Sequence, residues 1–153
     1  MIALTILALL APTELLANQH FRDITASLEQ SFEADGLRPV VRLCTSALRV
    51  GERDELMSEL DRGVVDVIIG THAILQQPII SRLANLGLVV IDEEQRFGVN
   101  QRQLIARDTN VLYTTATPIP RSLSKTVTAQ MQLSTLGGLR TLTCLFMYLC
   151  ILD

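Results

Sequence analysis

Five short apolar runs recur along most of the chain, and polar segments separate them. The runs are rich in Val, Ile and Leu, lack strict alternation, and cover residues 3–10, 39–43, 64–69, 86–91 and 110–113. Runs of this kind are typical of parallel strands that are covered on both faces of a sheet.

Helical periodicity lies between these runs. The apolar residues that share one face of the first expected helix are Ala17, Phe21, Ile24 and Leu28. Thr13 precedes this stripe and Gly36 follows it, so we predict a helix of about five turns that ends before the glycine. A second helix is predicted over 52–61, with Gly63 as its stop signal. Strands that alternate with helices indicate βαβ units and therefore an α/β fold with a mostly parallel sheet.

Composition limits the function classes. With 153 residues, 48% of them hydrophobic, the chain suits one domain with a real core. A net charge of -3 argues against a domain that holds nucleic acid by bulk electrostatics, so any DNA contact must be local. The three cysteines, Cys44, Cys144 and Cys150, have no zinc-ligand or disulfide spacing and favour a reducing compartment.

Both ends of the chain are apolar, but each run of about a dozen residues is shorter than the ~20 that span a bilayer. The first run also lacks the positive region and the cleavage pattern of a signal peptide. We therefore expect a buried strand there, no membrane span, and a protein that is not secreted.

Polar segments follow four of the apolar runs: "APTELLANQHF", "GTHAIL", "DEEQRFGV" and "TTATPIPRSL". Ligands of open parallel sheets bind at the carboxyl ends of the strands, where these segments lie. A carboxylate at such an end can hold Mg2+, which keeps most of its waters and needs only one or two protein oxygens. Asp92 then serves the metal, and Glu93 orients the water that attacks a phosphate. An acidic turn that opens a helix and complements its dipole explains the same residues equally well.

Taken together and in this order, "PTELLANQHF", "GTHAILQ", "VVIDEEQRFGV" and "TATPIPRSL" resemble the first motor domain of superfamily 2 DNA helicases and translocases. Within that group the chain is most similar to RecG-type helicases and transcription-repair coupling factors. The likeness runs from about residue 3 to residue 136. It implies a RecA-like fold of the P-loop NTPase type, with helices on both faces of the sheet, and ATP-driven movement on duplex or branched DNA.

The resemblance assigns roles to the acidic segment. It implies that Asp92 is the Mg2+ ligand and Glu93 the catalytic carboxylate. Glu94 and Gln95 then belong to the ATP-binding network that connects the nucleotide site with DNA. Related proteins often have His where this chain has Gln95, and an amide keeps the hydrogen bonding but loses a titratable group.

In the "TATPIPR" segment, the resemblance implies that Thr115 and Thr117 relay the nucleotide state toward the acidic segment. The alternative is a strand end that turns into a loop restricted by Pro118 and Pro120, whatever the function.

Three residues of the other two segments are the expected DNA contacts. Thr13 can cap a helix whose free amides hold a DNA phosphate, a contact that positions DNA without reading bases. Thr71 and His72 follow Gly70, whose missing side chain permits close backbone approach. The alternative for His72 is a loop histidine that bonds to local backbone.

The sequence also departs from the family. No Gly-Lys pair is present for a phosphate-binding loop, and Lys125 is the sole lysine. A second RecA-like lobe is missing as well, so we expect ATP and Mg2+ to bind weakly and hydrolysis to stay near background. After about residue 136, "GGLRTLTCLFMYLCILD" leaves the family pattern. We therefore expect a partial helicase domain over 1–136, incomplete at its N-terminus, an apolar tail over 137–153, and a truncated or mispredicted reading frame.

Three hypotheses follow. The first is a fragment of an ATP-dependent DNA helicase for DNA repair or recombination, inside the cell in the nucleoid, the cytoplasm or an organelle. Its partner is DNA, with RNA polymerase as a further partner if the parent is a coupling factor. The second is a non-catalytic module that binds DNA or a protein. The third is a small protein whose apolar ends insert into a membrane.

Overall fold

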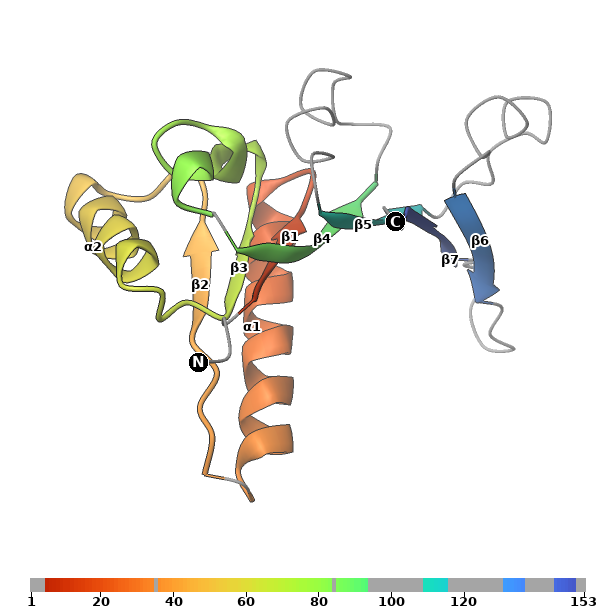
Figure 1. Cartoon of the computed structure of the whole chain (residues 1–153), viewed down its shortest axis with the longest axis horizontal. Helices are drawn as coiled ribbons and strands as arrows, with labels where there is room; N and C mark the ends of the chain where they lie inside the picture. Colours follow the sequence, from red (N-terminus) through yellow and green to blue (C-terminus); the bar gives the residue numbers. More distant parts are fainter. Residues whose placement is uncertain are drawn as a thin grey trace.

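The computed structural model describes residues 5–34, 36–83, 85–93, 109–115, 131–136 and 145–150, with the backbone alone for residue 115 and the last two ranges. The strands are β1 (Ile6–Leu10), β2 (Val41–Cys44), β3 (Val67–Gly70), β4 (Leu86–Asp92), β5 (Asn110–Thr115), β6 (Met131–Leu136) and β7 (Leu145–Cys150). The helices are α1 (Glu14–Phe32), α2 (Val50–Asp61) and the short 3-10 turns η1 (His72–Leu75) and η2 (Ile80–Arg82). Figure 1 shows their arrangement, with α2 beyond β2.

The described strands form one sheet in the order β2-β3-β1-β4-β5-β7-β6. The first five strands of the chain pair in parallel. β7 pairs antiparallel with both β5 and β6, which places this part of the expected tail inside the sheet. The five predicted strands and the mostly parallel sheet are confirmed.

The core lies on one face of this sheet. Ala8 of β1 is in register with Ile68 of β3 and Val89 of β4, and all three side chains are at most 1% exposed. Leu56 and Leu60 of α2 belong to the same buried cluster. Because α2 turns these residues inward, it covers this face.

The opposite face is covered less completely. Leu9, Val90 and Leu112 alternate with the core residues along their strands and are half-buried. α1 packs against β2 and β3 on this side, and Ala17 is the residue of α1 that becomes fully buried. The helices therefore lie on both faces, as predicted, but they protect the two faces unequally.

The ends of the helices match their sequence signals. The Thr13 side chain caps α1 by accepting a hydrogen bond from the Leu16 amide at 3.3 Å. Gly36 and Gly63 follow α1 and α2 with φ of 67° and 66°, a left-handed conformation that favours glycine. Within the part of the chain that the structure describes, no helix combines the length and the apolar character needed to cross a membrane.

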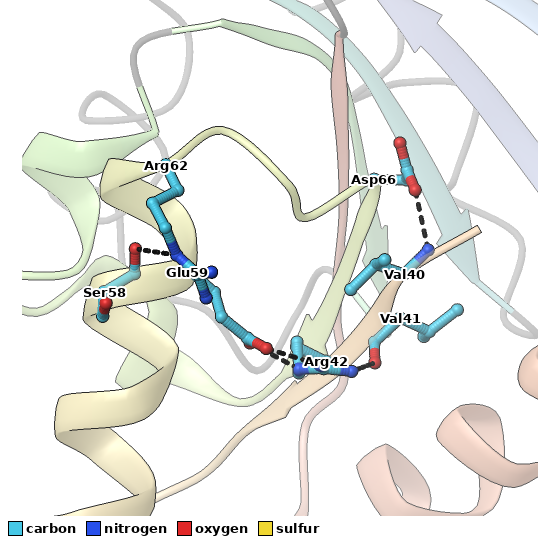
Figure 2. A network of polar contacts seen from close by, with 7 residues as sticks. All are labelled: Val40, Val41, Arg42, Ser58, Glu59, Arg62 and Asp66. Carbon is cyan, nitrogen blue, oxygen red and sulfur yellow. Dashed lines mark hydrogen bonds and ion pairs between the residues drawn. The ribbon is translucent and has the colours of Figure 1, made fainter. Parts of the chain in front are cut away.

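An ion pair joins α2 to the edge strand β2 (Figure 2). Arg42 donates from Nε and Nη2 to the two carboxylate oxygens of Glu59, at 2.5 and 2.6 Å. Its Nη1 donates to the Val41 carbonyl at 3.0 Å. The hydrogen bonds from Arg42 lower the pKa of Glu59, and those to Glu59 raise the pKa of Arg42. This bidentate pair fixes the distance between helix and strand.

Candidate nucleotide and nucleic-acid site

Four neighbouring strands bring the predicted site residues to one edge of the sheet. In the order β3-β1-β4-β5, the strands are parallel, so their carboxyl ends lie side by side. Thr71 and His72 follow β3, Thr13 follows β1, and Asp92 ends β4. The topology therefore gathers segments that are far apart in the sequence.

Asp92 stands at the centre of a small polar cluster at this edge. Its Oδ1 accepts a hydrogen bond from Thr114 Oγ1 of β5 at 2.8 Å. Its Oδ2 lies 3.2 Å from His20 Nε2 of α1. The Asp92 side chain is 24% exposed, so solvent and ligands reach a carboxylate that two other elements hold in place. The three residues His20, Asp92 and Thr114 are called the open cluster below.

Glu93 follows with an unusual backbone. Its φ is 57°, in the left-handed region that residues with a side chain rarely adopt. Its amide donates to the Thr114 carbonyl at 2.9 Å, which extends the β4–β5 pairing one residue past the strand. Such a conformation costs about 1 kcal/mol or more and is often found at functional sites.

The chemistry of these donors fits a hydrated Mg2+ ion. Each Asp92 oxygen has two lone pairs, and the contacts with described residues use one of them on each oxygen, which leaves the second one open as far as these residues are concerned. Within the described ranges, no three His, Cys, Asp or Glu side chains gather into a metal-binding group. Mg2+ does not need such a cage, because it takes one or two carboxylates together with water and phosphate oxygens.

The predicted DNA contacts differ in their accessibility. His72 is exposed at the start of η1, whereas Thr71 is 4% exposed and its hydroxyl accepts from the Ala73 amide at 3.4 Å. The Thr13 hydroxyl caps α1. Residue 70 must be a glycine, because a Cβ there would lie 1.8 Å from the Cys44 carbonyl oxygen. The side chain of Thr71 thus supports the local fold, and that of His72 is available to a ligand.

Several predicted site residues lie outside the described part of the chain, namely Glu94, Gln95 and Thr117. Thr115 ends β5, and the structure describes its backbone alone. Their roles stay predictions. Among the described side chains, Thr114 contacts the acidic segment, and the register places it opposite Asp92.

Residues 5–126 match the DEAD/DEAH box helicase family. The chain belongs to this family. The match covers β1 to β5 and thus includes the open cluster, so the RecA-like α/β fold and the helicase resemblance are confirmed.

Within the DEAD/DEAH box helicase family, the chain is similar to RecG. It is 42% identical over 135 residues to the ATP-dependent DNA helicase RecG of Staphylococcus aureus strain NCTC 8325, and 43% identical to that of Staphylococcus epidermidis strain ATCC 35984. Each alignment covers 86% of this chain and 18% of the relative. A solved structure of RecG bound to a three-way DNA junction aligns with a TM-score of 0.56 and 38% identity, over 78% of this chain and 15% of that one.

Two residues of this candidate site were not predicted from the sequence. Thr114 faces Asp92 across the β4–β5 pairing, and counting the two runs from their carboxyl ends would have suggested it. His20 lies three residues after Ala17 and so near the sheet-facing side of α1. Its spacing from the apolar stripe was therefore the available signal.

Proposed function

We propose that this chain forms part of the motor domain of an ATP-dependent DNA helicase of the RecG type. The placement of Asp92 and Glu93 beside Thr13 and His72 at one sheet edge supports this most. When a nucleotide site and a DNA-binding surface lie at the same edge of the sheet, a change at one site can reach the other through a few residues. The chain spans 18% of the length of its RecG relatives. Movement on duplex or branched DNA is therefore proposed for a longer protein that contains such a domain.

In this proposal Asp92 holds Mg2+ and Glu93 orients the attacking water. When bound, Mg2+ neutralises charge on the nucleotide phosphates. Glu94, Gln95, Thr115 and Thr117 complete the network between nucleotide and DNA.

DNA phosphates are contacted by Thr13, by the amides at the start of α1 and by His72. Thr71 positions the turn that carries His72, because its hydroxyl accepts a hydrogen bond from the Ala73 amide. RNA polymerase as a partner belongs to the coupling-factor alternative and stays a prediction. The same proposal implies that the protein acts inside the cell, where DNA is present.

For this chain by itself we propose DNA binding without ATP turnover. Its 153 residues contain no Gly-Lys pair, and Lys125 is the sole lysine. The phosphate loop of such enzymes uses its lysine and glycine-rich backbone to hold the nucleotide. Phosphate release should therefore equal the blank with and without DNA, and a rate stimulated by DNA would contradict this part of the proposal.

DNA binding tests the location of the surface. Fluorescence anisotropy with a labelled three-way junction should detect binding at low salt. Replacing Thr13 and His72 together by Ala should weaken it by about five- to tenfold, the loss expected for one or two hydrogen bonds. Arg38→Ala is the control, since Arg38 is exposed and precedes β2 at the opposite edge. An equal loss in the control, or none in the double variant, would place the DNA elsewhere.

A further inference from the structure

His20 connects two parts of the site that the sequence keeps 72 positions apart. It lies on α1 three residues after Ala17, whose side chain is 0% exposed. Its Nε2 is 3.2 Å from Asp92 Oδ2 on β4, and its side chain is 32% exposed. A carboxylate oxygen accepts hydrogen bonds, so Nε2 is the nitrogen that carries the hydrogen in this contact.

Two donors hold the Asp92 carboxylate, one at each oxygen. Thr114 Oγ1 donates to Oδ1 from β5, and His20 donates to Oδ2 from α1. Contacts at both oxygens restrict rotation of the carboxylate plane and aim the remaining lone pairs. The direction of those lone pairs decides where a metal ion or its bound water is accepted.

The two donors differ in what they are attached to. Thr114 lies in register with Asp92 in the strand beside it, so both residues keep the same position within the sheet. His20 belongs to a helix that is only partly buried against that sheet. The same helix begins at Thr13, seven residues or roughly 10 Å along the axis from His20. A displacement of α1 therefore reaches Asp92 through His20 and not through Thr114.

We propose that His20 is a positioning residue for Asp92 and transmits the position of α1 to the metal-binding carboxylate. This inference rests on the proposed function, in which Asp92 holds Mg2+ and the start of α1 contacts DNA. It adds a physical connection between the Mg2+ site and the DNA-contacting start of α1, and this connection runs through the His20 imidazole.

The contact itself is tested first, without any ligand. The chain has two histidines, so a long-range 1H–15N spectrum of the imidazoles contains two sets of signals. His72→Gln removes one set and identifies the other as His20. We expect His20 to be protonated at Nε2, and Asp92→Asn to shift its nitrogen signals while those of His72 stay in place. Unchanged His20 signals in Asp92→Asn would overturn the contact.

Metal binding then tests the positioning role. Mn2+ replaces Mg2+, and electron paramagnetic resonance counts the free ion during a titration of the full chain. His20→Ala should weaken Mn2+ binding about tenfold, the usual loss when a partner of a metal ligand is removed. His20→Gln should stay within about twofold of the wild type, because its amide N–H reaches the place of Nε2. Thermal melting followed by circular dichroism confirms that each variant is folded.

The outcomes separate this inference from the proposed function. Mn2+ binding that is lost in Asp92→Asn, reduced in His20→Ala and restored in His20→Gln supports both. Binding that needs Asp92 but is equal in wild type and His20→Ala leaves the metal site in place and overturns the positioning role. Binding that survives Asp92→Asn overturns the metal role of Asp92 and, with it, this inference.

Discussion

Two polar clusters stand on opposite faces of the sheet and use their carboxylates in opposite ways. In the closed pair, Arg42 and Glu59, both carboxylate oxygens receive hydrogen bonds from one guanidinium, and the Glu59 side chain is 9% exposed. In the open cluster, Asp92 receives one bond at each oxygen from two separate side chains, Thr114 and His20, and is 24% exposed. The first carboxylate is enclosed, and the second is more exposed and, among its contacts with described residues, has one at each oxygen.

This difference separates structure from function. Glu59 connects α2 to β2, and its side chain is buried, whereas that of its partner Arg42 is 41% exposed. Asp92 stands at the carboxyl end of β4, where ligands of parallel sheets bind. Loss of the closed pair should therefore lower stability, whereas loss of the open cluster should change binding more than stability.

The largest stability effect is expected where β2 and β3 approach each other closely at Gly70. Gly70→Ala places a Cβ 1.8 Å from the Cys44 carbonyl oxygen, so β2 and β3 must separate. We expect a loss of about 3 kcal/mol in the free energy of unfolding, the upper range for overpacking. Urea denaturation measures it. Gly51→Ala is the control, because nothing lies within 4 Å of its new Cβ; equal effects of the two changes would contradict the close fit.

The closed pair should give the next largest effect. Glu59→Gln removes the charge that accepts both hydrogen bonds from Arg42, and we expect a loss of about 2 kcal/mol in unfolding free energy. Glu55→Gln removes a neighbouring charge of α2 that acts on Arg42 by Coulomb attraction alone. The control should therefore change stability by less than about 0.5 kcal/mol. A matching loss in both variants would show that net charge, and not the bidentate contact, matters.

Acid should release the same pair. The pKa of Glu59 is lowered from 4.5 in the folded chain by the hydrogen bonds from Arg42. A lowered pKa stabilises the fold fully above the unfolded value, and the contribution disappears as the pH falls through the folded value. We expect the urea concentration at the unfolding midpoint to decrease as the pH falls below about 4.5. The decrease should be shallower in Glu59→Gln. Parallel pH curves for the two proteins would exclude this contribution.

The smallest effect is expected next to the open cluster, and its sign is opposite. Glu93 has a φ of 57°, which glycine adopts without strain. Glu93→Gly should therefore stabilise the chain by about 0.5 kcal/mol, the relief of strain minus the greater chain entropy of unfolded glycine. Glu93→Gln keeps the left-handed backbone and removes only the charge, so its thermal midpoint measures the part of the effect that comes from the carboxylate. Destabilisation by Glu93→Gly would mean that the side chain supports the turn.

The periodic parts of the fold were predictable from sequence. Buried strands and amphipathic helices repeat over many residues, so the strands β1 to β5 and both helices follow from their patterns, and Gly36 and Gly63 locate the helix ends. The 3-10 turns η1 and η2 were not predicted, because three or four residues carry no periodic signal. The pairing of β7 with β5 was missed for another reason: it depends on contacts distant in sequence.

The site was predictable to the level of its segments, but not of its contacts. The strand ends located Asp92 and Thr13 correctly at one edge. Among the described side chains, Thr114 provides the hydroxyl that bonds Asp92, a contact that depends on the exact register of β5 against β4. The roles of Thr115 and Thr117 stay predictions. Helical spacing from Ala17 could place His20 near the sheet, but its bond to Asp92 depends on how α1 packs on the sheet, which the spacing does not contain.

Mapping a bound metal ion tests the central claim, that the open cluster is the metal-binding part of the chain. Mn2+ broadens the amide signals of nearby residues in a 1H–15N spectrum of the labelled protein. We predict that the signals of Asp92, Glu93 and Thr114 broaden first, while those of Arg42 and Glu59 persist. Broadening centred instead on the exposed carboxylates at the end of α1, such as Glu29 and the C-cap residue Glu33, would contradict the claim.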